Sequence, residues 1–389
     1  MADQRITTNL GTGVTLSNGD DMIVLSDASI STFGSRAVTL SSSSHDVVVL
    51  GDLVTIGNTV VGYFNQNLNL DLGTLNFLVG RDGQVVGSPS DNAILLDLSS
   101  QLYLVNDGLI QGRDAINVTA SDAGAVMQVY NTGSIIGRDD AVSLGSGNNS
   151  SKVFNTGEII GGDVAVEYTG TGTGVATLVN QGSIMGTNAV QSFGYTTRIT
   201  NTGEITGNLL LSSEADVYNG RNGLLDGQAS MGGGDDLFRG GAEDNYVSGG
   251  ADNDLLAGYA GDDTLLGDTG FDTLSGGAGN DSLDGGGRND RLGGGKGDDT
   301  MTGGGGSDTF VIRRTGNGDD EVTDFQNGSD RVDISDLGVQ NFNQLNNQFG
   351  ALSQTTDGVL VDLEAAGGSG SILLGGMTLA DMDASDFIF

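Results

Sequence analysis

A nine-residue period between residues 231 and 311 constrains the fold of this chain more than any other feature. Nine consecutive nonapeptides follow the pattern G-G-x-G-x-D-x-U-x, where U is a large apolar residue, and residues 276–284 (GGAGNDSLD) match it best. The sixth position is Asp in eight repeats and Asn245 in the other, and the eighth position is always apolar. A disordered Gly/Asp-rich linker would not keep that apolar position, so the period predicts a solenoid.

The residue types predict how the repeats stack. Glycines allow left-handed backbone turns, and the x-U-x triplet forms a short strand with U pointing inward. Two repeats then make one coil of 18 residues, so the sixth positions of alternate repeats lie above one another. The first column contains Asp236, Asp254, Asp272, Asp290 and Asp308, and the second contains Asp263, Asp281 and Asp299 after Asn245.

These columns predict metal sites. Two carboxylates and several carbonyl oxygens meet between neighbouring turns, and hard oxygen ligands in that number suit Ca²⁺ rather than Zn²⁺ or Mg²⁺. Seven such sites fit the two columns, the weakest being expected at Asn245. Glu243 and Arg288 replace turn glycines, which puts their own turns in doubt. Without a counter-ion the carboxylates repel one another, so we expect calcium binding to supply the free energy of folding.

Composition excludes several classes of protein. The chain has no cysteine, a single histidine (His45) and a formal net charge of −36. These values exclude disulfides and H-E-x-x-H proteases, and they argue against nucleic acid and anionic membrane surfaces as partners. We expect no membrane insertion, because the longest apolar run is of the order of residues 47–50. Residues 1–10 also lack the regions of a Sec signal peptide.

A second, longer repeat occupies residues 28 to 230. Its core, N-x-G-x-I-x-G, recurs every 21 to 25 residues and is followed by two alternating strand patterns. The repeated asparagines are Asn106, Asn131, Asn155, Asn180 and Asn201. Three short strands per repeat predict one coil of a right-handed parallel β-helix. The asparagines are expected to stack as a ladder that satisfies turn amides; a row of sugar-binding side chains is the alternative.

The two periods define an all-β chain of three parts. We expect a parallel β-helix over 1–230, which continues without a linker into a calcium-binding parallel β-roll over 231–311. Residues 312–389 are expected to cap the roll, with strands at 331–334, 359–363 and 371–374 and a short helix at 342–349. The variable loops 121–125, 145–151 and 169–174 are small and polar, which makes them poor candidates for catalysis.

Residues 231–389 resemble the RTX (hemolysin-type calcium-binding) family, on the nonapeptides quoted above. The chain ends in Asp386-Phe387-Ile388-Phe389, which resembles the uncleaved C-terminal signal of type I secretion substrates, although a plain terminal strand is compatible with it. The resemblance implies export by type I secretion machinery of a Gram-negative bacterium, followed by folding outside the cell, where calcium is abundant. Family members include toxins, proteases, lipases, epimerases, adhesins and surface-layer proteins, so the resemblance does not fix a function.

The residues favour a non-enzymatic role. No G-x-S-x-G motif or long apolar helix supports a lipase or a pore-forming toxin. Arg113 and Arg138 beside Asp114 and Asp139 could form a shallow polyanion site, but a solvated column of ion pairs is the simpler interpretation. We therefore expect a secreted, self-associating surface-layer or extracellular-matrix component. The alternatives are a polysaccharide lyase or epimerase and a monomeric adhesin that binds cell-surface polysaccharide. No amphipathic cap helix is evident at the N-terminal end of the helix, so its strand edge is expected to pair with another subunit.

Overall fold

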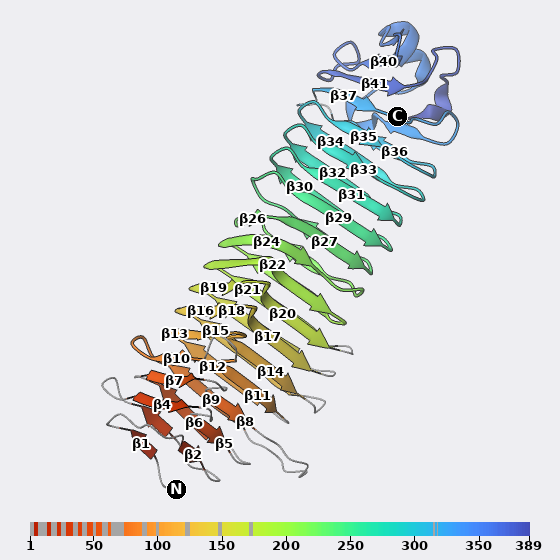
Figure 1. Cartoon of the computed structure of the whole chain (residues 1–389). Coiled ribbons are helices and arrows are strands. Elements are labelled where there is room, and N and C mark those ends of the chain that lie inside the picture. Colours follow the sequence, from red (N-terminus) through yellow and green to blue (C-terminus); the bar gives the residue numbers. More distant parts are fainter. Residues whose placement is uncertain are drawn as a thin grey trace. The chain divides into compact units, whose positions relative to one another are not determined.

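The computed structural model is a parallel β-solenoid, as the sequence predicts (Figure 1). It describes the side chains of residues 75–87, 92–96, 101–120, 125–145, 150–170, 174–313, 316 and 318–389, and elsewhere only the backbone of strands. The chain divides into two compact units, Met1–Ser213 and Glu214–Phe389. The first unit ends before the predicted boundary at residue 230. The three-part division itself stays a prediction.

Each central coil of the first unit contains three strands, as predicted. One coil consists of β12 (Gln101–Asn106), β13 (Leu109–Gly112) and β14 (Ile116–Ala120). The next coil pairs with it in parallel through β15 (Val126–Asn131), β16 (Ser134–Gly137) and β17 (Asp140–Ser146). Inward side chains such as Leu104, Ile110 and Val118 alternate with outward ones and are fully buried. Stacking therefore gives each coil the core that it cannot form alone.

The remaining strands of this unit repeat the same arrangement. The later coils contain β18 (Ser150–Asn155), β19 (Glu158–Gly161), β20 (Val164–Gly170), β21 (Val175–Asn180), β22 (Ser183–Phe193), β23 (Thr196–Asn201) and β24 (Glu204–Leu210). The earlier strands are β1 (Gln4–Ile6), β2 (Val14–Leu16), β3 (Met22–Val24), β4 (Ser29–Phe33), β5 (Val38–Leu40), β6 (His45–Val49), β7 (Asp52–Ile56), β8 (Val61–Tyr63), β9 (Thr74–Val79), β10 (Gln84–Val86) and β11 (Ile94–Leu98). The structure does not describe in full the edge of the first coil, so the expectation for that edge lies outside the described residues. The same holds for parts of the variable loops, residues 121–124, 147–149 and 171–173.

The recurring asparagines form the predicted ladder. Their side chains are at most 1% exposed, and each Nδ2 donates to the Oδ1 of the next asparagine. The four inter-coil distances are 2.8 Å from Asn106 to Asn131, 2.8 Å from Asn131 to Asn155, 2.9 Å from Asn155 to Asn180 and 2.9 Å from Asn180 to Asn201. Each of the first four also donates to turn carbonyls, as Asn155 does to Gly157 and Ser183. Because the ladder is buried, its amides cannot contact a sugar.

The second unit contains the nonapeptides, and their strands pair at the predicted 18-residue spacing. Odd repeats supply β28, β30, β32, β34 and β36 to one sheet, and even repeats supply β29, β31, β33 and β35 to the other. The strands of this region are β25 (Val217–Asn219), β26 (Leu224–Asp226), β27 (Gln228–Gly233), β28 (Leu237–Arg239), β29 (Tyr246–Ala251), β30 (Leu255–Ala260), β31 (Thr264–Thr269), β32 (Thr273–Ala278), β33 (Ser282–Asp284), β34 (Arg291–Lys296), β35 (Thr300–Thr302) and β36 (Thr309–Val311). The eighth-position side chains are all buried between the two sheets.

Residues 312–389 cap the last coils, as expected (Figure 1). The predicted strands are present as β38 (Arg331–Asp333), β40 (Gly358–Asp362) and β41 (Ser371–Gly375), and the predicted helix is the single turn η2 (Gln344–Gln348). The sequence did not predict β37 (Asp319–Val322), η1 (Ser335–Leu337), β39 (Leu352–Gln354) or η3 (Ala384–Asp386). The C-terminal residues form β42 (Phe387–Ile388), which pairs in parallel with β38. The final segment is thus a strand of the folded unit.

Candidate calcium-binding columns

The sixth-position carboxylates stack in the two predicted columns. In each column the backbone N–H of one residue donates to Oδ1 of the equivalent residue 18 positions later. The distances are 2.9 Å from Asp236 to Asp254, 2.7 Å from Asp254 to Asp272, 2.8 Å from Asp272 to Asp290 and 2.8 Å from Asp290 to Asp308. In the second column they are 2.8 Å from Asn245 to Asp263, 2.8 Å from Asp263 to Asp281 and 2.9 Å from Asp281 to Asp299. One oxygen of each of these carboxylates is therefore fixed by a backbone N–H of the previous coil.

The other oxygen of each carboxylate is buried and has no hydrogen-bond partner. This holds for Oδ2 of all eight predicted aspartates, which are between 1% and 3% exposed, and for Oδ1 of Asn245. A buried acceptor left unsatisfied costs roughly 1–3 kcal/mol, and more when it is charged. A row of such atoms is far outside what a folded chain tolerates by chance. The columns thus favour a ligand that supplies positive charge.

The glycine at the first position of the repeats after Met231 shows where that ligand would lie. A Cβ built on Gly285 would be 2.7 Å from Asp290 Oδ2 and 2.8 Å from the carbonyl oxygen of Gly303 in the next coil. At Gly267 the corresponding distances to Asp272 Oδ2 and the Gly285 carbonyl are 2.7 Å and 2.5 Å. Carboxylate and carbonyl oxygens therefore converge on space that only glycine leaves open, and such oxygens suit Ca²⁺.

The electrostatics of the columns agree with this geometry. Burial, reinforced by neighbouring carboxylates, raises the pKa of Asp236 to about 8 and the pKa of Asp254 to about 7. The pKa values of Asp263, Asp290 and Asp299 rise to about 7 for the same reasons. Burial likewise raises the pKa of Asp272, Asp281 and Asp308 to about 6. Folding therefore disfavours the ionised carboxylates, and a bound cation reverses that preference.

Backbone oxygens must complete the sites. Within the described residues there is no group of three or more His, Cys, Asp or Glu side chains that could hold a metal ion. The carbonyl-rich turns meet this need, because positions two and four adopt left-handed φ in most repeats, including Gly277 (128°) and Gly279 (137°). Carbonyl and carboxylate ligands in combination are usual for Ca²⁺ and unusual for Zn²⁺.

The two turns in which Glu243 and Arg288 replace a glycine have different conformations. Arg288 keeps the left-handed conformation with φ of 87°, and its guanidinium lies 5.3 Å from the centre of the Phe271 ring. In the repeat of Asn245, Gly241 and Glu243 do not adopt the left-handed conformation, although both are fully described. The weakest predicted site thus also has the most irregular turn.

The columns extend past the repeats, which the sequence analysis missed. The N–H of Asp216 donates to Asp236 Oδ1 (2.6 Å), that of Asp299 to Asp320 (3.2 Å), and that of Asp308 to Asp330 (2.9 Å). The coils that reach these residues are 20 to 22 residues long, so a strict period of 18 does not find them. Each of the three still begins a D-x-U triplet, and that shorter pattern would have identified them.

A second ladder at the fifth position was also missed. Side-chain oxygens at this position accept the N–H of the fifth position one coil later: Asp262 accepts from Asn280 at 2.7 Å, and Asn280 accepts from Asp298 at 2.9 Å. Seven of the nine fifth positions are Asp or Asn, a bias that predicts a role. These side chains lie outside the buried columns and point in the opposite direction along the stack, so they stabilise the turns from outside.

The comparison with known families supports the calcium assignment. A family model of the RTX calcium-binding nonapeptide repeat, four copies long, matches residues 232–265, 257–292 and 284–311. The chain carries RTX calcium-binding repeats. RTX repeats bind Ca²⁺, so this protein is a calcium-binding β-solenoid. A search of curated proteins gives no match.

The other predicted polar site lies on the β-helix, at Arg113. Its guanidinium lies 3.1 Å from Asp114 and 3.9 Å from Asp139, and it donates to Asn92 at 2.9 Å. This arrangement fits the ion-pair interpretation better than a polyanion site.

Among the described residues, no helix has the length and apolar character needed to cross a membrane.

Proposed function

We propose that this protein is a secreted structural component that folds on Ca²⁺ outside the cell and self-assembles as part of a surface layer or extracellular matrix. In this proposal the predicted aspartates are the carboxylate ligands of the inter-coil sites. They are Asp236, Asp254, Asp263, Asp272, Asp281, Asp290, Asp299 and Asp308. Asp216, Asp320 and Asp330 extend the columns at their ends.

The observation that carries the proposal is the row of buried carboxylate oxygens without partners. Such a row makes the folded roll unfavourable wherever calcium is scarce, and extracellular-type calcium sites typically bind at about 10⁻⁴–10⁻³ M. A chain of this kind stays unfolded in a calcium-poor cytosol, which suits export through a type I channel. It then folds where calcium is abundant, so folding and location are coupled.

Surface features support self-association. Large apolar side chains that are at least 37% exposed occur in both units, and Tyr246, Leu255, Tyr259 and Phe271 are all in the calcium roll. In this proposal these exposed apolar side chains contribute to a protein–protein contact. The net charge of −36 opposes that contact until cations neutralise it. Calcium would therefore both fold the roll and permit its packing.

Particle size in calcium and in chelator tests this proposal. Light scattering and electron microscopy should show sheets or filaments in millimolar Ca²⁺ that dissolve when a chelator is added. A calcium-folded monomer at every concentration would refute the assembly role. Secretion needs a separate assay, in which a bacterium with a type I system exports the full chain but not a variant that lacks residues 386–389. Export of both would refute the C-terminal signal.

A further inference from the structure

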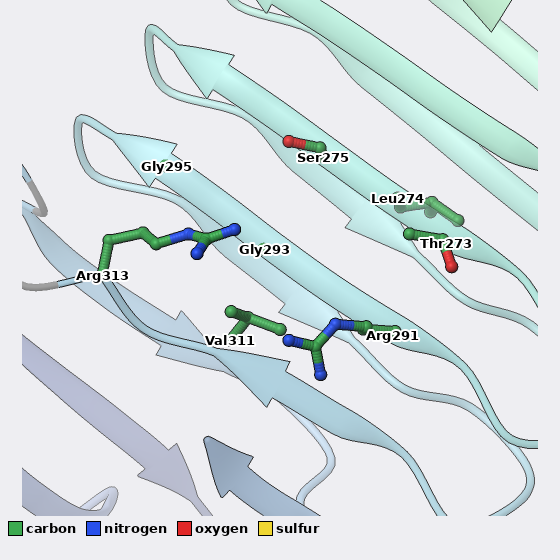
Figure 2. Close-up of a pocket in the computed structure, with 8 residues that line it drawn as sticks. All are labelled: Thr273, Leu274, Ser275, Arg291, Gly293, Gly295, Val311 and Arg313. Carbon is green, nitrogen blue, oxygen red and sulfur yellow. The ribbon is translucent and has the colours of Figure 1, made fainter. Parts of the chain in front are cut away.

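A small cavity with two arginines lies on the outer face of the calcium roll (Figure 2). It has a volume of about 100 Å³ and is formed by β32 and β34 together with the segment from β36 to Arg313. Its lining residues are Thr273, Leu274, Ser275, Arg291, Gly293, Gly295, Val311 and Arg313. None of these is acidic, although the chain has 51 acidic and only 15 basic residues. The cavity therefore presents two guanidinium groups on a strongly acidic protein, and that of Arg291 also pairs with Asp333 outside the lining.

The positions of the side chains follow from the register of the strands. Thr273 pairs with Arg291, and Ser275 pairs with Gly293, so two hydroxyls face the cavity from β32. Figure 2 shows Arg291 and Arg313 approaching the Val311 side chain from two sides, with Arg313 reaching back toward Gly293. Arg291 also bonds Asp333 Oδ2 at 3.0 Å, which holds its guanidinium in place.

The size and the donors of the cavity select the ligand. Pockets that enclose whole small molecules typically measure about 300–1,000 Å³, so this one accommodates a single acid group. Guanidinium groups match the planar, two-oxygen geometry of a carboxylate. Thr273 and Ser275 can each donate to or accept from a hydroxyl next to that carboxylate. A carboxylate with neighbouring hydroxyls is the chemistry of an acidic sugar.

The cavity lies on strands that directly follow residues of the first carboxylate column. Thr273 and Arg291 directly follow Asp272 and Asp290, which are consecutive members of the first calcium column, and the next member, Asp308, begins the segment that leads to Val311. The strands that line the cavity are thus held in register by the same inter-coil contacts that a bound calcium ion would complete. We propose that the RTX roll binds the carboxylate of an acidic sugar residue between Arg291 and Arg313, and does so only when calcium is bound.

Titration of the full chain with glucuronate, followed by ligand-observed NMR, tests the proposal. The methyl ester of glucuronate is the matched neutral ligand. In millimolar Ca²⁺ we expect glucuronate to bind and the ester not to bind, and we expect neither to bind in chelator. Arg313→Gln removes charge-assisted hydrogen bonds, so it should weaken glucuronate binding about tenfold or more.

Two further variants separate the cavity from the fold. Gly293→Val should abolish binding without unfolding the roll, because a Cβ there meets Val311 at an ordinary 3.5 Å and the residue lies in a strand. Arg331→Gln is the matched control: Arg331 pairs with Thr309 on the next strand but does not line the cavity, so binding should be unchanged. Circular dichroism in calcium checks that each variant folds.

Several results would overturn the proposal. They are equal binding of the methyl ester, binding that survives chelation, and undiminished binding by Arg313→Gln and Gly293→Val.

Sedimentation without sugar tests whether the carboxylate comes instead from a second copy of the protein. If Arg313→Gln weakens self-association while glucuronate fails to bind, the cavity holds an acidic side chain of a second copy, and the sugar proposal is wrong. Calcium-dependent folding is measured separately and does not depend on this outcome.

Discussion

In both units, buried polar side chains form hydrogen bonds between successive coils, but the side chains are amides in one unit and carboxylates in the other. In the β-helix one buried asparagine per coil donates from Nδ2 to Oδ1 of the next, as Asn155 does to Asn180 at 2.9 Å. In each column of the roll one buried aspartate per coil accepts the N–H of the previous coil, as Asp281 does from Asp263 at 2.8 Å. The amide carries both a donor and an acceptor, so its ladder is complete within the chain. The carboxylate is only an acceptor, so one oxygen of every step remains unsatisfied.

This difference separates a permanent ladder from a conditional one. Replacing an NH₂ group by an oxygen removes the donor and adds a negative charge to the same buried position. The cost of an unsatisfied buried charge is several times that of a lost neutral hydrogen bond. The amide ladder stabilises its coils in any medium, whereas the carboxylate ladder stabilises its coils only when a cation is present. The comparison makes testable predictions for each unit.

The largest expected effect is that of calcium removal. Chelation should unfold the roll and leave the β-helix folded, because among the residues described with side chains the unsatisfied buried carboxylates all lie in the roll. Hydrogen exchange on the full chain measures both units at once. Amides of residues 236–311 should lose protection in chelator, and those of 101–210 should keep it. Equal loss of protection in both units would show that the helix depends on the folded roll.

The second-largest expected effect is that of acid on the calcium dependence of folding of the roll. The pKa values of the column aspartates are raised to about 6 to 8, so their protonated forms favour the folded state. That stability is fully present below the unfolded pKa of roughly 3.9 and is lost as the pH rises through the folded values. In chelator the roll should therefore be more ordered at pH 5 than at pH 8. In calcium, protons compete with the metal, so the calcium midpoint measured by circular dichroism should rise on acidification below about pH 7. A midpoint independent of pH would contradict this view.

Breaking the amide ladder should affect only the first unit. Asn155→Ala removes hydrogen bonds to Asn131, Asn180, Gly157 and Ser183 at a fully buried position. We expect a loss of about 2–4 kcal/mol in the stability of this unit, measured by urea unfolding. The calcium midpoint of the roll should not change. Asn117→Ala, on an outward position of β14 in the same unit, is the control and should cost much less.

The sequence predicted the parts of the structure that depend on strict periods. Both repeats, the two carboxylate columns and the buried asparagines follow from residue spacing alone, because stacking converts a period into a contact. It missed Asp216, Asp320 and Asp330 because longer connections shift them out of the 18-residue register, although their hydrogen bonds continue the columns. It also missed β39, which pairs antiparallel with β40, because the cap has no repeat and its pairing depends on tertiary contacts. The arginine cavity arises from side chains of three successive coils, which no local pattern brings together.

The smallest expected effect tests the comparison most directly, because the substitution places a side-chain amide in a column of carboxylates. Asp281→Asn keeps the shape and the backbone hydrogen bond from Asp263 but removes one charge from two neighbouring sites. Asn245 already places a side-chain amide at the head of the second column, where its backbone N–H donates to Asp263 as an aspartate's does. The calcium midpoint should rise by about tenfold, which corresponds to roughly 1.4 kcal/mol, and the roll in chelator should become slightly more stable. Asp262→Asn, in the outer ladder, removes the same charge from a side chain that accepts from Asn280, and it should shift the midpoint much less. If the two variants shift it equally, net charge rather than the buried column controls folding.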